Sequence, residues 1–252
     1  GQYIHSCLLL LEKEKGYDLS KTTVGLVGVG HVGHAVIEAI RPLGVQILLN
    51  DPPQKEALRK AGKPHEFFLK MEELQEKCDI ISFHTPLITK GPYPTFHLAN
   101  KTFFNALKKQ PIIINTSRGA VVDNTDVLQA LKDGIIRDAI IDTWENEPNI
   151  NQELLNLIYI GTPHIAGYSA DGKANATRMA LTALCNHFHL PVTFQIRVPQ
   201  LPEEELPESN LTETERALVL YNPHTDSLKL KSHPTMFEEL RGNYPLRREF
   251  IE

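Results

Sequence analysis

The chain has 252 residues, of which 41% are hydrophobic and 23% are charged, a composition typical of a folded globular protein and unlike that of a disordered one. Lys and Arg number 26 against 31 Asp and Glu, so the net charge of −5 offers no general attraction for a phosphate backbone, and we expect no nucleic-acid partner. No apolar stretch is long enough to cross a bilayer, so we expect no membrane association.

Cysteine and histidine usage argues against disulfide and metal sites. Cys7, Cys78 and Cys185 lie far apart and form neither a disulfide framework nor a Cys-x-x-Cys pair, which suits a reducing compartment and a cytoplasmic protein. The spacing of His187 and His189 puts them on opposite sides of a helix, so we expect no metal site.

The first residues have the pattern of a helix. Gly1 opens without a preceding Met into residues 2–15, whose apolar stripe is Ile4, Leu8 and Leu11. We expect this stripe to pack in the core of this chain or against a further domain that the sequence does not contain. A chain that opens in this way is expected to be a fragment of a longer protein.

Short apolar runs then alternate with helical patterns. The runs that we predict as strands are 23–27, 45–49, 79–83, 111–115, 138–142 and 159–160. The helical patterns are 31–43, 70–77, 101–109, 123–132 and a longer one over 171–189. Strands this apolar are buried on both faces, and their alternation with helices predicts an α/β fold with a doubly wound parallel sheet of the Rossmann type.

The character of the chain changes after Pro191. Several prolines and the acidic run 203–205 indicate a solvated crossover. Beyond it we predict a strand over 217–221, a turn over 222–226, a returning strand over 227–230 and a short helix over 237–241. We therefore predict a nucleotide-binding domain over 1–191 and a small C-terminal α+β domain over 192–252. The apolar strands of the second domain must pack against the first domain or against a second copy of the chain.

A glycine-rich motif follows the first predicted strand. Gly28, Gly30 and Gly33 form a GxGxxG pattern that opens a helix, which permits a tight turn, approach of a pyrophosphate and close helix–strand packing. Asp51 ends the next strand, where a carboxylate accepts hydrogen bonds from ribose hydroxyls and repels a 2′-phosphate. The alternative to a dinucleotide site is that the glycines form a purely structural turn and that residues 51–53 form another turn. The spacing indicates NAD rather than NADP.

Three polar residues follow consecutive later strands: Arg118, Glu147 and His164. A guanidinium grips a carboxylate in a fork, and an imidazole takes a hydroxyl proton. A carboxylate beside the imidazole stabilises its protonated form. Taken singly, Arg118 suits a surface ion pair, Glu147 a loop carboxylate and His164 a structural role. Their joint placement beside the dinucleotide motif predicts oxidation of a 2-hydroxy acid.

Over about residues 1–191 these motifs resemble the NAD-dependent D-isomer-specific 2-hydroxyacid dehydrogenases. The segments 91–98, 167–173 and 237–250 narrow the resemblance to one branch of that family. The resemblance implies oxidation of a small phosphorylated 2-hydroxy acid by a homodimer joined through a C-terminal dimerisation domain. It also leads us to expect a substrate-binding domain before Gly1.

Site residues follow from the resemblance position by position. Arg118 and Glu147 match active-site residues, and His164 matches the proton donor. Positions implied to contact NAD, besides the three glycines, are Asp51, Thr85, Asp142 and Gly167, together with the backbone amides of His31 and Val32. Tyr168 matches a substrate contact.

Two other functions remain open at this point. One is another D-2-hydroxyacid dehydrogenase, and the other is an NAD-sensing binding protein on the same fold, which can retain the same three polar residues. Arg247 and Arg248 suit either a substrate phosphate or, as we expect, a solvated or interfacial pair.

Overall fold

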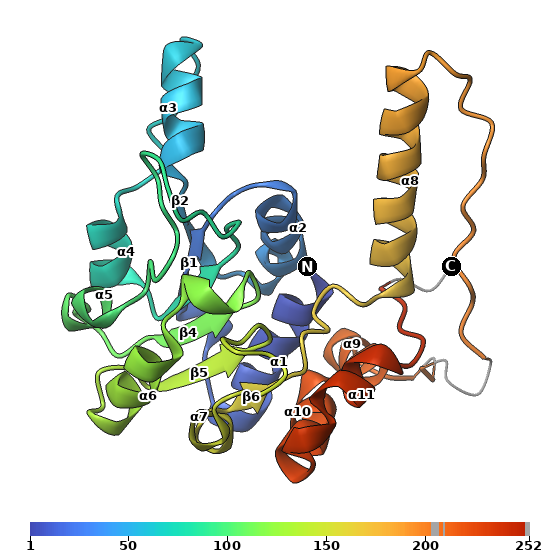
Figure 1. Ribbon diagram of the computed structural model, residues 1–252. Helices are drawn as coiled ribbons and strands as arrows, with labels where there is room; N and C mark the ends of the chain where they lie inside the picture. The colour runs from blue at the N-terminus through green and yellow to red at the C-terminus, as the bar shows by residue number, and fades with distance from the viewer. Residues whose placement is uncertain (203–206, 209, 250–252) are drawn as a thin grey trace.

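A six-stranded parallel sheet forms the centre of the computed structural model, which describes residues 1–202, 207–208 and 210–249 (Figure 1). Its order is β2-β1-β3-β4-β5-β6. The strands are β1 (Thr23–Val27), β2 (Gln46–Asn50), β3 (Ile80–Phe83), β4 (Ile112–Asn115), β5 (Asp138–Ile141) and β6 (Ile160–Gly161). The predicted α/β fold and all six predicted strands are confirmed.

The strand order reverses between β1 and β3. The chain moves outward from β1 to β2 and then crosses back, so that β3 to β6 extend the sheet in the opposite direction. In open parallel sheets, ligands bind outside the carboxyl ends of the strands at such a reversal. This topology therefore places the candidate site at the carboxyl edge of the sheet.

Helices flank the sheet, and most begin where the sequence predicts. They are α1 (Gln2–Lys15), α2 (His31–Ile40), α3 (Pro52–Lys60), α4 (Met71–Lys77), α5 (Lys101–Asn105), α6 (Asn124–Lys132), α7 (Gln152–Leu157) and α8 (Ala170–His187). Two of these helices are not predicted from the sequence: α3 buries no residue and so lacks an apolar stripe, and α7 has only six residues. No helix within the described residues is long and apolar enough to cross a membrane.

The apolar stripe of α1 packs inside this chain. Ile4, Leu8 and Leu11 are fully buried in a cluster that also contains residues of α2 and of β1. Burying a leucine side chain contributes about 1.5–3 kcal/mol, so α1 is a substantial part of the core. A second cluster covers the other face of the sheet and includes residues of α4 to α7.

The C-terminal segment is helical, and the two strands predicted there are wrong. Its helices are α9 (Glu213–Leu220), α10 (Pro223–Ser232) and α11 (Phe237–Gly242), and the structure has no strand in the described part of residues 192–252. The reasons are two start signals that the strand reading overlooked. Thr212 and Glu215 form a capping box, and Asn222 caps a helix whose first residue is Pro223. Only the short helix predicted over 237–241 is confirmed; the acidic run 203–205 lies outside the described residues.

These helices are covered by their own chain. Leu218 and Tyr221 join the cluster that contains α1, and Leu230 and Phe237 join the cluster on the opposite face. The Ser227 hydroxyl of α10 accepts a hydrogen bond from the backbone N–H of Gly161 at 2.9 Å, so α10 covers the edge strand β6. A second copy is therefore not needed to bury them.

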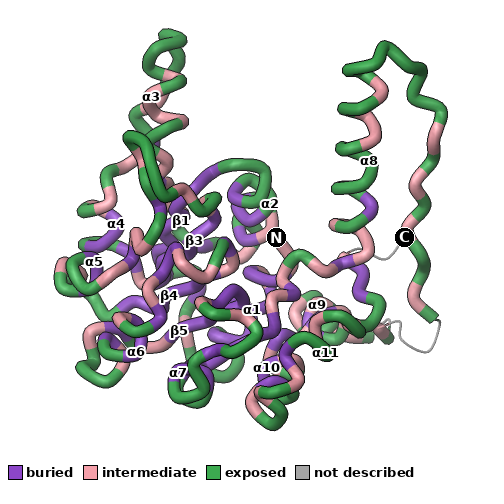
Figure 2. Tube along the Cα trace, viewed as in Figure 1, coloured by how far each residue is buried: buried purple, intermediate pink, exposed green. Residues whose placement is uncertain are grey.

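By contrast, α8 stands away from the body of the molecule (Figure 1). Only Ala174 is buried along its 18 residues. Figure 2 shows the rest of the helix as exposed or intermediate, whereas burial concentrates in the sheet and α1. Met179 and Leu184 of α8 are each more than half exposed, so this helix carries uncovered apolar surface that the sequence did not predict.

A substitution in α10 tests how far this helix belongs to the core. Leu230 has no exposed surface, whereas Leu228 on the same helix is 55% exposed. We expect Leu230→Ala to lower the free energy of unfolding by about 2–5 kcal/mol, because it leaves a cavity between α10 and the sheet. Leu228→Ala is the control and should stay within about 0.5 kcal/mol of the unmodified protein. Urea unfolding measures both, and equal changes would contradict the packing described for α10.

Candidate active site

The predicted site residues gather at the carboxyl edge of the sheet. Gly28 follows β1, Asp51 follows β2 and Thr85 comes shortly after β3. On the other side of the reversal, Arg118 follows β4 and Glu147 follows β5. His164 follows β6. The topology therefore brings the strand ends together as the sequence predicted, although the side chains do not all touch.

The glycine-rich loop requires two of its glycines for space. Gly28 has φ +91°, and a Cβ there would lie 2.7 Å from the carbonyl oxygen of His84. A Cβ on Gly33 would lie 2.4 Å from the carbonyl oxygen of Gly28. At Gly30 a Cβ would meet nothing within 4 Å, and His31 and Val32 are exposed at the start of α2. The loop thus leaves open space in front of free backbone amides at a helix N-terminus, which suits a pyrophosphate.

Asp51 links this loop to α3. Its Oδ2 accepts a hydrogen bond from the Val29 N–H at 2.8 Å, and its Oδ1 caps α3 by accepting from the Gln54 N–H at 3.0 Å. The residue therefore has a structural role as well as a position beside the glycine-rich loop. Oδ2 also accepts from the Gln54 side-chain amide at 3.1 Å, so Oδ1, which accepts a single hydrogen bond, is the oxygen with a lone pair left for the predicted contact to a ribose hydroxyl.

Thr85 supplies a polar atom that the protein does not satisfy. Its Oγ1 is buried and has no hydrogen-bond partner among the described residues. The neighbouring His84 is held between Ser82 and Thr116, at 2.9 and 3.2 Å, and burial lowers its pKa to about 3. His84 is therefore neutral at physiological pH and serves the framework, while the Thr85 hydroxyl is available to a ligand.

Asp142 shapes the loop that carries His164. Its carboxylate is 1% exposed and accepts hydrogen bonds from the Ile165 and Ala166 N–H groups at 2.8 and 3.0 Å and from the Thr162 hydroxyl at 2.6 Å. Burial raises the pKa of Asp142, and these hydrogen bonds oppose the rise. His164 has φ +58°, a left-handed conformation that is uncommon for residues other than glycine. The hydrogen bonds to Asp142 hold Ile165 and Ala166, the two residues that follow His164, in place.

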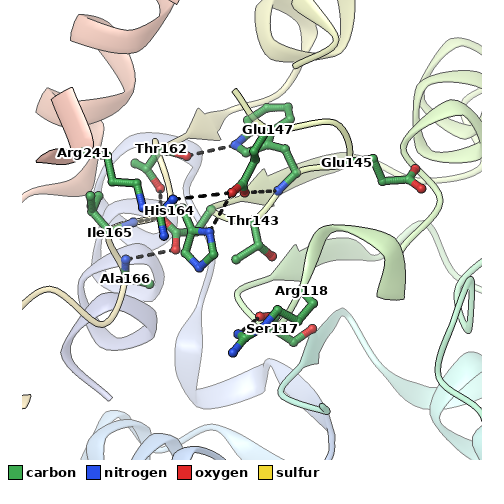
Figure 3. Close-up of polar contacts among 12 residues, drawn as sticks. Ser117, Arg118, Thr143, Glu145, Glu147, Thr162, His164, Ile165, Ala166 and Arg241 are labelled. Atoms are coloured by element: carbon green, nitrogen blue, oxygen red, sulfur yellow. Dashed lines mark hydrogen bonds and ion pairs between the residues drawn. The ribbon is translucent and has the colours of Figure 1, made fainter. Parts of the chain in front are cut away.

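Glu147 and His164 form a hydrogen-bonded pair (Figure 3). The Nδ1 atom of His164 lies 2.9 Å from Oε2 of Glu147, and the Trp144 N–H donates to Oε1 of Glu147 at 2.8 Å. Glu147 is thereby fixed on both oxygens. Because Nδ1 of His164 is engaged, Nε2 is the ring nitrogen left to exchange a proton with a substrate.

Arg118 lies apart from this pair. Its guanidinium donates to the carbonyl oxygen of Ser117 at 2.6 Å, and Figure 3 draws no contact from it to Glu147 or His164. The residue is exposed. The structure therefore assembles two of the three predicted groups into one unit and places the third across from them.

Gly167 and Tyr168 continue the His164 loop toward the C-terminal helices. Gly167 is exposed, with nothing within 4 Å of the position that a Cβ would take. The Tyr168 hydroxyl accepts a hydrogen bond at 3.1 Å from Nε of Arg241, a residue that sequence reasoning did not include in the site. Arg241 lies in the segment 237–250 that narrows the resemblance, but the sequence did not assign it to the site, since its neighbours there are more than seventy positions away.

The expectation for Arg247 and Arg248 as a solvated or interfacial pair is wrong. They are 4% and 3% exposed. Arg247 donates to the carbonyl oxygen of Ala166 at 2.7 Å, and Arg248 pairs with Asp171 at 3.0 Å. Both therefore tie the C-terminal tail to the loop that carries His164.

Comparison with known proteins agrees with this geometry. The family described as D-isomer specific 2-hydroxyacid dehydrogenase, NAD binding domain, matches residues 10–166. The chain belongs to the D-isomer-specific 2-hydroxyacid dehydrogenases. It therefore carries the NAD-binding domain of a family of dehydrogenases, and NAD is its cofactor. Within the described residues, the open glycine-rich loop and the unsatisfied Thr85 hydroxyl fit that group.

Individual relatives of this D-2-hydroxyacid dehydrogenase chain cover nearly all of it. It is 51% identical over 249 residues to the erythronate-4-phosphate dehydrogenase of Bacteroides fragilis, which is 99% of this chain and 70% of the relative. The enzyme of the same name from Escherichia coli O157:H7 is 37% identical over 258 residues, 99% of this chain and 67% of the relative. The apo structure of Rhodotorula graminis D-mandelate dehydrogenase aligns with a TM-score of 0.57 and 26% identity, over 77% of this chain and 57% of that one.

Cofactor choice should depend on Asp51. We expect the chain to bind NAD well ahead of NADP, because the carboxylate repels a 2′-phosphate, and we expect Asp51→Ala to narrow that preference. Titration calorimetry with both cofactors measures the effect. Asp51 also caps α3, so Asp123→Ala, which removes the corresponding cap of α6 outside the site, is the matched control and should keep the preference. Equal affinity of the unmodified chain for NAD and NADP would contradict the assignment.

Proposed function

We propose that this chain is the NAD-binding and C-terminal part of an enzyme that oxidises 4-phospho-D-erythronate to 2-oxo-3-hydroxy-4-phosphobutanoate, a step of pyridoxal 5′-phosphate biosynthesis. The observation that carries the proposal is the His164–Glu147 pair at the carboxyl edge of an NAD-binding sheet. Identity of 51% to a curated erythronate-4-phosphate dehydrogenase over 99% of the chain supports this choice of substrate within the family.

The oxidation removes a hydride from C2 of the substrate and a proton from the hydroxyl oxygen on C2, which leaves a carbonyl group at C2. NAD, when bound, supplies the hydride acceptor. Nε2 of His164 takes the hydroxyl proton, because Nδ1 is held by Glu147 at 2.9 Å. The carboxylate of Glu147 stabilises the imidazolium that results, and the Trp144 N–H keeps that carboxylate in place.

Arg118 binds the carboxylate of the substrate in this scheme. Figure 3 draws no contact between its guanidinium and Glu147, and the guanidinium offers a fork of donors that matches a carboxylate. The substrate would then lie with its C1 carboxylate toward Arg118 and its C2 hydroxyl toward His164.

Turnover of the complete gene product tests the proposal. With NAD present, NADH formation followed at 340 nm, a wavelength at which only the reduced cofactor absorbs, should be faster with 4-phospho-D-erythronate than with D-lactate or D-glycerate. A higher kcat/KM for one of those acids would identify a different D-2-hydroxyacid dehydrogenase. Absence of turnover with every acid, together with partner binding that depends on NAD, would favour an NAD-sensing protein.

For the assembly we propose a homodimer in the cytoplasm. The proposed division places the NAD-binding part at residues 1–191 and the dimerisation part at 192–252, and the surface for a second copy lies at their junction. Its apolar side chains are each more than half exposed: Met179, Leu184, Phe188, Leu190 and Val192. Three free cysteines suit a reducing compartment.

Light scattering tests the assembly. At micromolar concentration we expect a dimer, and we expect Phe188→Glu to yield monomers because it puts a charge on the apolar face. Leu228→Glu, on the exposed face of α10, is the control and should leave the dimer intact. A monomer for the unmodified protein would overturn the dimer.

A further inference from the structure

Arg241 reaches the candidate active site from the C-terminal helices. It lies on α11, and its Nε donates to the Tyr168 hydroxyl at 3.1 Å. Its Nη1 is 4.0 Å from Oε2 of Glu147, close enough for attraction but too far for a hydrogen bond. Figure 3 shows the side chain beside His164. An arginine from a separate part of the chain thus lies next to the reacting pair.

The Nη groups of Arg241 remain available for a ligand. Glu147 is already hydrogen-bonded to Nδ1 of His164 and to the Trp144 N–H, so its negative charge is partly compensated without Arg241. Among the described residues, the only hydrogen bond of the Arg241 side chain is the one from Nε to Tyr168. A half-buried guanidinium with unused donors can bind an anion through the paired N–H groups of its fork.

Other contacts hold this part of the chain against the His164 loop. Arg247 donates to Ala166 and stacks on the ring of Tyr221 at 4.0 Å, and its own carbonyl oxygen accepts from the Ala170 N–H at 2.8 Å. Arg248 pairs with Asp171 at 3.0 Å. Because these contacts are buried and lie on both sides of Tyr168 in the sequence, the position of Arg241 beside Tyr168 is built into the fold.

A second cation lies next to the same tyrosine. Nζ of Lys173, in the first turn of α8, is 4.4 Å from the centre of the Tyr168 ring, and the guanidinium carbon of Arg241 is 6.0 Å from it. Two cationic side chains thus lie close to Tyr168, with Asp226 one residue further out on the hydroxyl of the neighbouring Tyr244. This combination favours a ligand with more than one negative charge.

We propose that Arg241, together with Tyr168, binds the phosphate group of the substrate. In the view of Figure 3, His164 lies between Arg118 and Arg241. A substrate with its C1 carboxylate at Arg118 and its C2 hydroxyl at His164 extends its far end toward Arg241. The phosphate is on C4, two carbons beyond the reacting centre, and is the second anionic end of the molecule. The inference rests on the proposed function and assigns the group in it that distinguishes this substrate from shorter hydroxy acids.

Kinetics with and without the phosphate test the role of Arg241 in the complete gene product. We expect Arg241→Gln to lower kcat/KM for 4-phospho-D-erythronate by about 10²-fold, the usual effect of losing two hydrogen bonds to a charged group. Unphosphorylated D-erythronate should lose less than about threefold. Arg241→Lys should recover part of the loss, because an ammonium keeps the charge without the fork. Arg216→Gln, an exposed arginine of α9, is the matched control and should change neither rate.

A binding measurement separates this inference from the proposed function. Inorganic phosphate should bind the unmodified protein at least tenfold more tightly than Arg241→Gln, whether or not the enzyme turns over any acid. Equal binding of phosphate, or equal losses of kcat/KM on the phosphorylated and unphosphorylated acids, would overturn the assignment and make Arg241 a residue that positions Glu147. Slow turnover of both acids by the unmodified protein would instead count against the proposed substrate.

Discussion

Replacing His164 by alanine is expected to lower kcat of the complete gene product by about 10²–10⁴-fold, the usual contribution of a general acid–base group. The structure leaves only Nε2 of His164 for the substrate, because Nδ1 is bound to Glu147 at 2.9 Å. Alanine removes the proton acceptor while leaving the NAD loop untouched, so affinity for NAD should stay within about twofold of the unmodified protein. Stopped-flow measurement of NADH formation and a separate NAD titration check the two parts.

The control for this substitution is another histidine–glutamate pair. Nδ1 of His224 lies 3.1 Å from Glu14, in a pair like that of His164 and Glu147 but between α10 and α1, away from the strand ends. His224→Ala should therefore leave kcat unchanged. If His164→Ala turns over at the unmodified rate, the proton acceptor has been assigned to the wrong residue.

Replacing Arg118 by lysine should lower kcat/KM by about 10²-fold or more, although the charge is kept. A lysine ammonium is a point charge and cannot reproduce the two parallel hydrogen bonds of the guanidinium fork to a carboxylate. Arg118 contacts only Ser117 among the residues drawn in Figure 3, so few framework contacts are lost and folding should be little affected. Steady-state kinetics measure the loss, and the thermal midpoint of unfolding checks the fold.

Arg137→Lys is the matched control. Arg137 is an exposed arginine immediately before β5, at the amino edge of the sheet and opposite to the site. It should leave kcat/KM within about twofold. Turnover of Arg118→Lys at the unmodified rate would show that Arg118 does not bind the substrate.

The sheet and the loops of the candidate site could be predicted from local sequence patterns. Strands such as 112–115 are almost wholly apolar because they are buried on both faces, so a short run of isoleucine and valine is a strong local signal. The loops that follow such strands can then be located as well. Gly28, Asp51, Glu147 and His164 could therefore be placed at one edge of the sheet from the sequence.

Tertiary structure alone decided the C-terminal helices and the groups that they bring to the site. A short run such as 217–221 has no period long enough to separate a strand from a helix, and here the capping box at Thr212 and packing against α1 select the helix. Arg241 contacts Tyr168 across 73 positions of sequence. The burial of Arg247 likewise depends on a stacked tyrosine far from it in the chain. Such contacts depend on how the C-terminal helices pack against the sheet and α1, and they cannot be predicted from the residues nearby in the sequence.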